Sequence, residues 1–544
     1  MPKGGWPAKK FGNYIQFSFG DYYPKIPVFQ LLKNTAKRTP DRVFILHPKR
    51  LTFGEVDELS DRLATALASL GIKKGNTVGI FLWNSPEFVI AFYGILKIGA
   101  TVTALNPSFK EKDAKHQLDD SEAVALIVDE EFYPTIENIR RELPRLKHII
   151  ITGEKKFPET YLFDELLKNY PPNPPKVEIN PEEDIAALQY TAGTTGLPKG
   201  CMLTHYNLVS NALQVALFSA VAWGLHDEEN VTLVHLPLYH SYGMTVCLNA
   251  SALAGGQIVI QKRFDPVEWL ELIQKYRVNA VATVMPVISF YVKNPDLLKK
   301  YDLSSLKFVN NGAVPIMLEV AKEFEKLTGV TVTQGYGLSE TSPVTNSNPK
   351  VHIKLESVGP PFPDTEEKIV DPDDPAKELP PGEVGELAIR GPQVMKGYWK
   401  RPEETAKALT PDGWLLTGDL AKMDEDGYVY IVERKKEIIK CMGFTIAPAE
   451  LEAVLLEHPA VFDCAVVPKP DPEKVEVPKA YVALKPEYKA SPELAEELLK
   501  WVNSKVAGYK KIHEVEFVAS IPRSLAGKVL RREFIEREKK RVSG

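Results

Sequence analysis

Residues 191–200, Thr-Ala-Gly-Thr-Thr-Gly-Leu-Pro-Lys-Gly, combine three glycines, three hydroxyls and one lysine directly after an apolar run. Glycines let backbone N–H groups turn toward an anion without steric cost, and the hydroxyls and the ammonium group add further donors. The preceding residues 184–190 read as a buried strand, and open α/β sheets bind ligands at the carboxyl ends of their strands. The segment therefore predicts a loop that wraps a phosphate chain.

This loop differs from the P-loop of GTPases and kinases. In that P-loop the lysine directly follows the second glycine and a helix begins at once, whereas here Leu197 and Pro198 intervene. A helix-like pattern begins only near Thr204 and His205. The alternative reading is a flexible Gly/Thr turn on the surface.

A second glycine-rich segment, residues 334–341, has the sequence Gln-Gly-Tyr-Gly-Leu-Ser-Glu-Thr. The ring of Tyr336 can stack on a base, and Glu340 beside it can hold a hard cation. Mg²⁺ prefers one or two carboxylates together with phosphate oxygens and water, so Glu340 suits Mg²⁺ next to a phosphate loop. Taken alone, the segment would be an ordinary Gly-rich turn.

Two further segments carry candidate polar groups. In residues 236–243, Leu-Pro-Leu-Tyr-His-Ser-Tyr-Gly, His240 lies between two tyrosines just past a predicted strand, where the chain opens into a helix. This arrangement fits the polar mouth of an apolar tunnel, or else a packed core histidine. Asp419 could accept both hydroxyls of a ribose, or else serve as a turn residue or helix cap.

Lys528 lies on a glycine turn near the end of the sequence. It could deliver a positive charge to a reaction centre, or it could be the first member of the basic series that follows. That series alternates with glutamates and is interpreted as a solvated helical end. Its members are Arg531, Arg532, Glu533, Glu536, Arg537, Glu538, Lys539, Lys540 and Arg541.

Size and composition exclude several classes of protein. The chain of 544 residues should divide into two to four domains, and its net charge of −5 argues against a dedicated nucleic-acid binder. The four cysteines form no CxxC pair, which fits a reducing cytoplasm and suggests neither a disulfide framework nor a zinc site. No apolar stretch approaches the ~18 residues that span a bilayer, so we expect no integral membrane segment.

Alternating apolar runs and amphipathic helices predict an α/β protein with mostly parallel sheets. We expect a large N-terminal domain, residues 1–434, made of two βα-layered sheets and a small β subdomain. Its parts span about 1–180, 181–345 and 346–434, with the Gly/Thr loop on the first strand of the second sheet. The pattern changes after Arg434, which predicts a separate, small and mobile α+β domain over residues 435–544.

Taken together, these segments resemble the adenylate-forming superfamily of acyl-CoA synthetases, luciferase-like enzymes and peptide-synthetase adenylation domains. The resemblance covers nearly the whole chain in order, through residues 191–200, 236–243, 311–315, 334–341, 385–405, 417–419, 434–452 and 522–528. Residues 433–448 look most like those of the fatty-acyl and coumarate-type CoA ligases. Ala192 in place of a frequent Ser, Ser339 in place of a frequent Thr, and Met285-Pro286-Val287 in place of Pro-Pro depart from commoner forms.

The resemblance implies an enzyme with ATP, Mg²⁺ and CoA as cofactor and substrates. A carboxylate would attack the α-phosphorus of ATP to give an acyl-adenylate, and the thiol of CoA would then displace AMP. Lys528 would bridge the carboxylate and the α-phosphate, and His240 would orient the carboxylate. Lys436 matches the hinge about which the small domain swings, and the Gly443 loop would meet the pantetheine.

The remaining roles follow the family pattern. The phosphates would be held by Thr191, Gly193, Thr194, Thr195, Gly196 and Lys199, and the metal by Glu340 and Thr191. The adenosine and the second-step groups would be held by Gly312, Ala313, Val314, Gln334, Gly335, Tyr336, Ser339, Asp419, Arg434, Lys436, Lys440, Gly443 and Lys528. The acyl pocket would be lined by Tyr239, His240, Ser241, Tyr242, Met244, Asn311, Gly312, Gly337, Leu338, Ser342, Pro343 and Val344.

Apart from His240, this pocket set is mainly apolar and has no basic residue for a second carboxylate, and the glycines at 312 and 337 leave depth. It favours a medium- or long-chain fatty acid, with an aromatic acid such as a cinnamate as the alternative. A peptide-synthetase module would need a carrier domain after Lys528, and no feature requires the oxygen chemistry of a luciferase. A non-catalytic acyl- or adenylate-binding protein would be expected to lack Lys199, Glu340 or Lys528. Members of this build are monomers or homodimers.

Overall fold

The computed structural model describes residues 8–12, 14–191, 198–225, 230–435, 437, 439–441, 444–471, 474–506, 508–523 and 529–543. They fall into two compact units. Unit 1 comprises residues 1–366, 389–415 and 426–428, and unit 2 comprises residues 367–388, 416–425 and 429–544. Unit 2 thus includes strands that the sequence analysis assigned to the N-terminal side of residue 434, and the domain boundary at that residue stays a prediction.

Unit 1 contains the first large sheet, in which strands and helices alternate along the chain, as the sequence predicts. The sheet has seven strands in the order β11-β10-β6-β5-β7-β8-β9. Its strands are β5 (Thr77–Phe81), β6 (Thr101–Ala104), β7 (Ala123–Asp129), β8 (His148–Thr152), β9 (Tyr161–Leu162), β10 (Ile185–Thr191) and β11 (Lys199–Thr204). Its helices include α2 (Phe53–Ser69), α3 (Pro86–Lys97), α4 (Glu111–Asp120), α5 (Tyr133–Ile139) and α6 (Phe163–Asn169).

Capping side chains fix where several of these helices begin. Thr52 accepts a hydrogen bond from the Glu55 amide, and the Glu55 side chain accepts one from the Thr52 amide, which completes a capping box on α2. Ser85 caps α3 through the amide of Phe88, and Pro86 occupies the first helical turn, where no amide donor is required. These local signals explain why α2 begins at Phe53 and α3 begins at Pro86.

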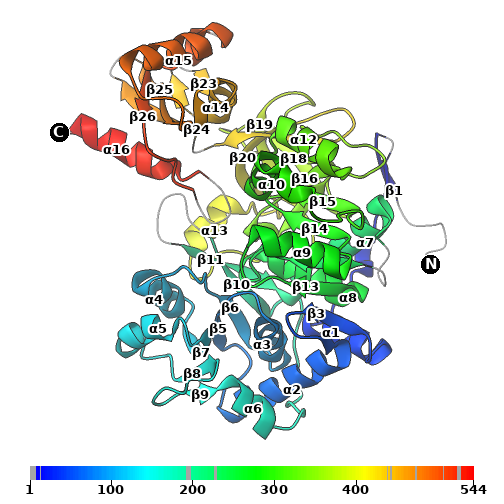
Figure 1. Ribbon diagram of the computed structural model, residues 1–544. Helices are drawn as coiled ribbons and strands as arrows, with labels where there is room; N and C mark the ends of the chain where they lie inside the picture. Colours follow the sequence, from blue (N-terminus) through cyan, green and yellow to red (C-terminus); the bar gives the residue numbers. More distant parts are fainter. Residues whose placement is uncertain are drawn as a thin grey trace. The chain divides into compact units, whose positions relative to one another are not determined.

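The second large sheet has eight strands in the order β17-β16-β15-β14-β12-β13-β3-β4. Its strands are β3 (Val43–His47), β4 (Leu51–Thr52), β12 (Val231–Val234), β13 (Gln257–Ile260), β14 (Ala280–Thr283), β15 (Phe308–Asn311), β16 (Val332–Gly337) and β17 (Val344–Ser347). The helices around it are α1 (Phe29–Arg38), α7 (His205–Trp223), α8 (Ala250–Ala254), α9 (Pro266–Tyr276), α10 (Met285–Lys293), α11 (Pro295–Leu298) and α12 (Leu318–Thr328). Figure 1 shows the strands of both sheets in the interior, with helices over their faces.

The sheet assignment of the Gly/Thr loop differs from the sequence-based expectation. Strand β10 pairs in parallel with β6, so it belongs to the first sheet and not to the second. The residues after the loop form the antiparallel strand β11, where the sequence analysis expected no strand. A short strand paired with its neighbour through an irregular hairpin carries no periodic signal long enough to be recognised.

Unit 2 contains two smaller sheets. The four-stranded sheet, in the order β18-β19-β20-β21, is formed by β18 (Glu366–Val370), β19 (Gly385–Arg390), β20 (Leu415–Met423) and β21 (Val429–Arg434). The five-stranded sheet contains β22 (Ile439–Cys441), β23 (Phe444–Ile446), β24 (Val461–Asp471), β25 (Val475–Leu484) and β26 (Glu514–Phe517). Its helices are α14 (Pro448–Leu456), α15 (Pro492–Lys505) and α16 (Arg531–Ser543).

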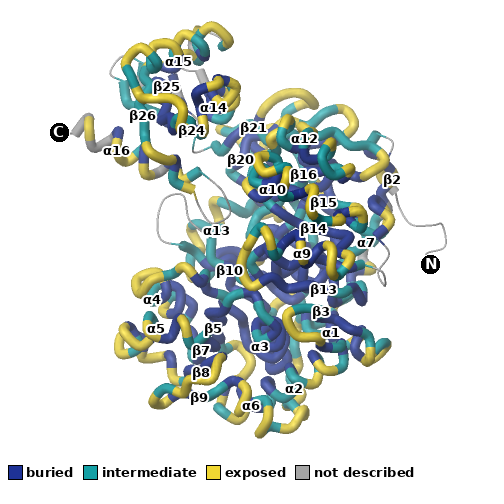
Figure 2. The backbone as a smooth tube through the Cα atoms, in the orientation of Figure 1, coloured by how far each residue is buried: buried dark blue, intermediate teal, exposed yellow. Residues whose placement is uncertain are grey.

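Burial follows this architecture. Strands and inner helix faces are buried, and the outer faces of the helices are exposed (Figure 2). Helix α3 is buried on nearly every side, and its core cluster joins residues from both large sheets, among them Val102 and Ile258. No helix in the described part of the chain is long and apolar enough to cross a membrane. The fold confirms the predicted α/β class.

Candidate active site

The phosphate-loop candidate connects β10 to β11. Thr191 ends β10 and lies opposite Lys199, the first residue of β11, so both ends of the loop are fixed by strand pairing. The intervening residues 192–197, which include Gly193, Thr194, Thr195 and Gly196, lie outside the described residues. Thr191 and Lys199, the described ends of the loop, therefore lie opposite each other on neighbouring strands.

A segment far along the chain runs beside β11. The amide of Met202 donates to the carbonyl of Gly397 at 2.8 Å, and the amide of Trp399 donates to the carbonyl of Gly200 at 2.8 Å. These backbone bonds add a short strand-like stretch to the hairpin and place Tyr398 next to Cys201 of β11.

Tyr398 contacts two of the predicted catalytic residues. Its hydroxyl donates to Oε1 of Glu340 at 2.8 Å, and Nζ of Lys199 lies 4.2 Å from the centre of its ring. Burial, followed by the negative charge of Glu340, raises the pKa of Tyr398, so the hydroxyl stays protonated and donates. Lys199 also forms an ion pair with Glu404. The structure thus places Lys199 and Glu340 at one tyrosine, and both residues, with Thr191, lie near the buried Cys201.

Glu340 lies in the short helix η5 (Ser339–Thr341), which follows β16. Strands β12, β14, β15 and β16 run parallel, so their carboxyl ends lie at one edge of the second sheet. The predicted adenine-binding segments follow these ends. After β15, Gly312 donates its amide to Thr283 at 3.0 Å and Ala313 adopts a positive φ of 64°. Nδ2 of Asn311 donates to the carbonyl of Val314 at 2.9 Å, which ties the turn together.

The residues at the end of β16 are packed tightly. Oε1 of Gln334 accepts the amide of Ile316 at 2.5 Å, and Tyr336 pairs with Asn346 of β17. A Cβ atom on Gly337 would lie 2.2 Å from the carbonyl oxygen of Pro343, and one on Gly335 would lie 2.9 Å from that of Asn346. These glycines are required because another backbone approaches closely.

His240 follows β12 in the turn before η4 (Tyr242–Asn249); the helix predicted here is present and is a π-helix. Its Nδ1 accepts the amide of Tyr242 at 3.3 Å, so the proton of the neutral ring resides on Nε2. Burial lowers the pKa of His240, which keeps the ring neutral near pH 7. The residue can therefore donate one hydrogen bond without carrying a charge.

A cavity lies among α7, η4, α8, β12, β14 and β15. No described charged side chain lines it; its lining includes Phe218, Val246, Ala282 and Phe308. Of the predicted pocket residues, Tyr242 and Val344 line it. The others lie on η4, the ends of β15 and β16 and the adjoining turns: Tyr239, His240, Ser241, Met244, Asn311, Gly312, Gly337, Leu338, Ser342 and Pro343.

Tyr242 connects this cavity to the turn after β15. Its hydroxyl donates to Oδ1 of Asn310 at 3.0 Å. A Cβ atom on Gly312 would meet the Tyr242 ring at 2.7 Å, so the ring packs directly on that glycine. π-Helical segments are rare and are frequently found at functional sites.

Unit 2 holds the predicted ribose-binding pair. Nε of Arg434 lies 2.6 Å from Oδ1 of Asp419, whose side chain is only 3% exposed. The backbone of Lys440 lies in β22. Lys436, Gly443 and Lys528 lie outside the described residues, so their predicted roles stay predictions.

The sequence analysis gave no role to Tyr398, Glu404, Glu433 or Arg531. Tyr398 stood in a recognised Gly-Tyr-Trp motif, which was the available signal. The interpretation of residues 531–541 as a solvated helical end was wrong for two members, because Arg531 is 9% exposed and Glu538 is 1% exposed. Their partners come from distant strands and helices, which charge alternation along one helix does not indicate.

Comparison with known proteins identifies the family. Residues 32–399 match the family of AMP-binding enzymes, and residues 450–528 match the AMP-binding enzyme C-terminal domain. A long-chain-fatty-acid–CoA ligase of Bacillus subtilis is 36% identical over 95% of this chain and 95% of its own. 4-Coumarate–CoA ligase 1 of Petroselinum crispum is 37% identical over 94% of each chain.

Among solved structures, the anthranilate CoA ligase AuaEII in complex with anthranoyl-AMP aligns with a TM-score of 0.87 and 28% identity, over 96% of this chain and 98% of its own. Fold, order of motifs and sequence identity agree over nearly the full length. The chain belongs to the AMP-binding, adenylate-forming enzymes and, within them, to the acyl-CoA synthetases, which ligate an acid to the thiol of CoA.

Proposed function

We propose that this enzyme joins medium- to long-chain fatty acids to CoA, with Mg²⁺ bound beside the phosphates of ATP. The observation that carries the chain-length proposal is the cavity behind Tyr242, which has no charged side chain in its described lining. An uncharged lining rich in Phe, Val and Ala suits a hydrocarbon tail, because burying a second carboxylate there without a partner would be costly.

In the first half-reaction, a carboxylate oxygen of the acid bonds to the α-phosphorus of ATP. The bond from that phosphorus to the bridging oxygen breaks, and pyrophosphate leaves with the electron pair. Lys199 and Thr191, which face each other across the β10–β11 pairing, supply positive charge and a hydrogen bond to the phosphates. Lys528 contributes a second cation between carboxylate and α-phosphate, by resemblance to the family.

The residues around Glu340 fit a magnesium ion. One carboxylate beside a phosphate chain, with the Thr191 hydroxyl as a further oxygen ligand, matches the preference of Mg²⁺ for hard oxygen donors. The hydrogen bond from Tyr398 orients the carboxylate of Glu340. When bound, the ion would neutralise charge on the phosphate oxygens and the departing pyrophosphate.

In the second half-reaction, the sulfur of CoA bonds to the acyl carbonyl carbon, the bond to the phosphate oxygen breaks, and AMP leaves with the electron pair. The thiol proton passes to solvent. Nε2–H of His240 can donate to the carbonyl oxygen, where negative charge develops. We assign the remaining roles by the family pattern. The adenine is held by Gly312, Ala313, Val314, Gln334, Gly335, Tyr336 and Ser339, and the ribose is held by Asp419 and Arg434. The position of the small domain and of CoA in the second half-reaction depends on Lys436, Lys440 and Gly443.

An aromatic acid is the second candidate substrate. The Tyr242 hydroxyl and the Asn310 side chain, bonded to each other at 3.0 Å in the cavity wall, could hydrogen-bond the phenol of a coumarate-like acid. The 4-coumarate–CoA ligase relative is as similar as the fatty-acid ligase, which supports testing both classes.

The four cysteines are free and buried, which is usual for proteins of the reducing cytoplasm. We place this enzyme in the cytoplasm, as a monomer or homodimer.

The deciding experiment is mass-spectrometric analysis of products formed from ATP, Mg²⁺, CoA and an equimolar panel of C2 to C18 fatty acids with benzoate and coumarate. We expect acyl-CoA concentrated at C8 or longer. Aryl-CoA as the main product would replace the fatty-acid assignment with the aromatic one. Acyl-AMP without thioester would show that the acceptor is not CoA.

A further inference from the structure

The C-terminal body, residues 439–544, is joined to the four-stranded sheet of unit 2 by a single stretch of chain. Strand β21 ends at Arg434 in the four-stranded sheet, and β22 begins the five-stranded sheet at Ile439. The body has a hydrophobic core of its own, which includes Val466 and Leu498. With only residues 435–438 as a covalent link, its position relative to the four-stranded sheet depends on non-covalent contacts beside that link.

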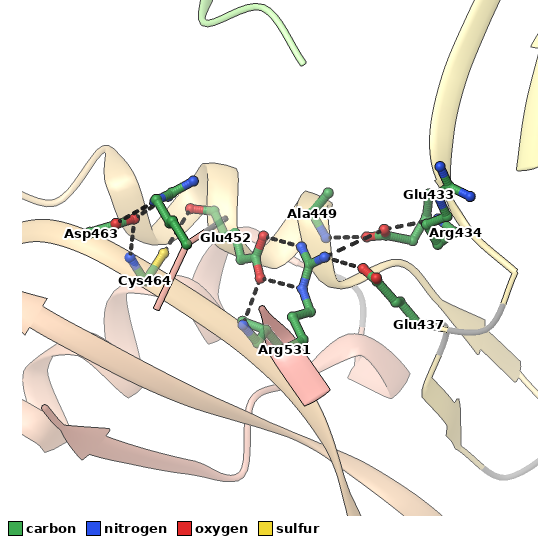
Figure 3. A network of polar contacts seen from close by, with 10 residues as sticks. Glu433, Arg434, Glu437, Ala449, Glu452, Asp463, Cys464 and Arg531 are labelled. Atoms are coloured by element: carbon green, nitrogen blue, oxygen red, sulfur yellow. Dashed lines mark hydrogen bonds and ion pairs between the residues drawn. The ribbon is translucent and has the colours of Figure 1, made fainter. Parts of the chain in front are cut away.

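Glu433 provides such contacts from the β21 side. Its Oε2 accepts the amide of Ala449 at 2.8 Å, in the first turn of α14, and its Oε1 accepts the amide of Arg434 at 2.9 Å (Figure 3). Amides in the first helical turn have no partner within the helix, and a carboxylate there is also favoured by the helix dipole. The side chain of Glu433 is only 5% exposed, so water competes little for these bonds.

Arg531 is the second partner of Glu433 and belongs to the C-terminal body. Its guanidinium forms two bonds with Glu452, at 3.1 Å from Nε and 2.7 Å from Nη2, and a further ion pair with Glu437. Nη1 lies 3.9 Å from Oε1 of Glu433. Glu452 would remain with Arg531 if the body moved, and Glu437 lies in the link itself. Glu433 is the member of this cluster that β21 contributes, and it makes the longest of these ion pairs.

The cluster is poorly balanced in charge. Among the side chains that the structure describes, three carboxylates surround one guanidinium, a formal surplus of two negative charges. Burial raises the pKa of Glu433, partly opposed by Arg531 and by the two amides. Because Glu433 shares its one positive partner with two other carboxylates, repulsion from them opposes its attraction to Arg531 and lowers the free energy needed to open this contact.

Glu433 also adjoins the predicted ribose-binding pair. The next residue, Arg434, donates its amide to Glu433 and its guanidinium to the buried Asp419. Two consecutive residues of one strand therefore connect the ribose-binding pair to the contact with the C-terminal body.

We propose that Glu433 is a releasable latch that holds the C-terminal body in one position through the Ala449 amide and Arg531, and that the catalytic cycle requires the latch to open and close. Glu433 is a positioning residue and touches no substrate. The inference rests on the proposed function, because the body has reason to change position only if it serves two half-reactions.

The test compares the half-reactions in Glu433→Gln, which keeps the shape of the side chain and removes its charge. Adenylate formation is followed by pyrophosphate release, and thioester formation is followed with supplied acyl-AMP and CoA. We expect the ratio of the two rates to change at least about fivefold, because losing the latch shifts the body between positions. An unchanged ratio, or equal loss of both rates, would overturn the proposal.

Glu450→Gln is the matched control. Glu450 lies next to Ala449 on α14, but its carboxylate pairs with Lys510 at 2.7 Å within the C-terminal body. Removing that charge breaks an ion pair of the same helix without touching the contact with β21. We expect both half-reaction rates and their ratio to match those of the unaltered enzyme.

Hydrogen–deuterium exchange tests the latch without activity. In Glu433→Ala the Ala449 amide loses its acceptor, so a peptide covering residues 446–456 should exchange faster than in the unaltered protein, and Glu450→Ala should not show this. Unchanged exchange would overturn the latch. Absence of both half-reactions in the unaltered enzyme would instead overturn the proposed function, and the exchange result would still decide the contact.

Discussion

The hydroxyl of Tyr398 donates a 2.8 Å hydrogen bond to Oε1 of Glu340, although 57 residues separate the two in the chain. Tyr398 reaches Glu340 because residues 397–399 pair with β11. Its ring also contacts the ammonium group of Lys199. One tyrosine thus orients the candidate magnesium ligand and supports the candidate phosphate-binding lysine.

We expect Tyr398→Phe to raise the Mg²⁺ concentration for half-maximal activity about tenfold, because losing a bond that orients a metal ligand typically weakens metal binding by that factor. The ring remains, so its contact with Lys199 is kept. Activity measured against Mg²⁺ at saturating ATP tests this. Tyr430→Phe, which removes a hydroxyl bonded to Asp424 at 3.0 Å, is the control. An identical Mg²⁺ dependence in the two variants would contradict the role of Tyr398.

Gly312→Ala should shorten the preferred acyl chain. The added Cβ would lie 2.7 Å from the Tyr242 ring, and displacing this ring changes the cavity that it lines. We expect kcat/KM for C12 acids to fall at least about tenfold while that for C4 acids changes less.

Gly337→Ala provides the contrast. Its Cβ would lie 2.2 Å from a backbone carbonyl, which cannot move aside like a side chain. This variant should lower the melting temperature and affect all chain lengths alike. If both glycine variants gave the same substrate profile, the placement of the acyl chain beside Tyr242 would be wrong.

Asp419→Asn should weaken ATP binding. The substitution removes the buried charge that Arg434 contacts at 2.6 Å and leaves the partly exposed guanidinium with a weaker partner. A charged hydrogen bond contributes about 1.5–3 kcal/mol, so KM for ATP should rise about tenfold or more. The steady-state KM of the acid serves as internal comparison, and a rise confined to the acid would refute the ribose assignment.

Lys528→Ala should abolish adenylate formation and largely spare thioester formation from supplied acyl-adenylate. The lysine is expected to stabilise the carboxylate and the α-phosphate in the first step alone. Separate assays of the half-reactions check this. Loss of both to the same extent would count against a division of labour between two positions of the small domain.

His235 should make the enzyme sensitive to mild acid. Burial lowers the pKa of His235 to about 4, so the folded state resists a proton that the unfolded chain accepts below pH 6.5. Above pH 6.5 His235 is neutral in both states, so the free energy of unfolding does not change with pH through this group. As the pH decreases from 6.5 toward 4, the free energy of unfolding falls by up to about 3 kcal/mol. Melting temperatures of the wild type and His235→Asn between pH 7.5 and 4 test this. We expect the difference between them to shrink in acid, and parallel curves would exclude the effect.

Local chemistry in the sequence predicted much of the fold. Thr52, Ser85 and Ser491 cap helices that begin at the next residue, because each cap is made by a side chain within three residues of the amide it accepts. The alternation of apolar runs and amphipathic helices predicted the α/β class with mostly parallel sheets. Strand β11 and the membership of β10 in the first sheet were not found, because sheet order depends on contacts between segments far apart in the chain.

For the candidate site, the sequence by itself determined the types and the order of the chemical groups: the hydroxyls and lysine of residues 191–200, the carboxylates of Glu340 and Asp419, and the histidine at 240. These follow from short segments whose chemistry does not depend on distant partners. Tertiary structure decided which side chains position them. Tyr398 meets Glu340, and Arg531 meets Glu433, only after residues from separate elements pack together and exclude water, and that burial gives their hydrogen bonds and charges their strength.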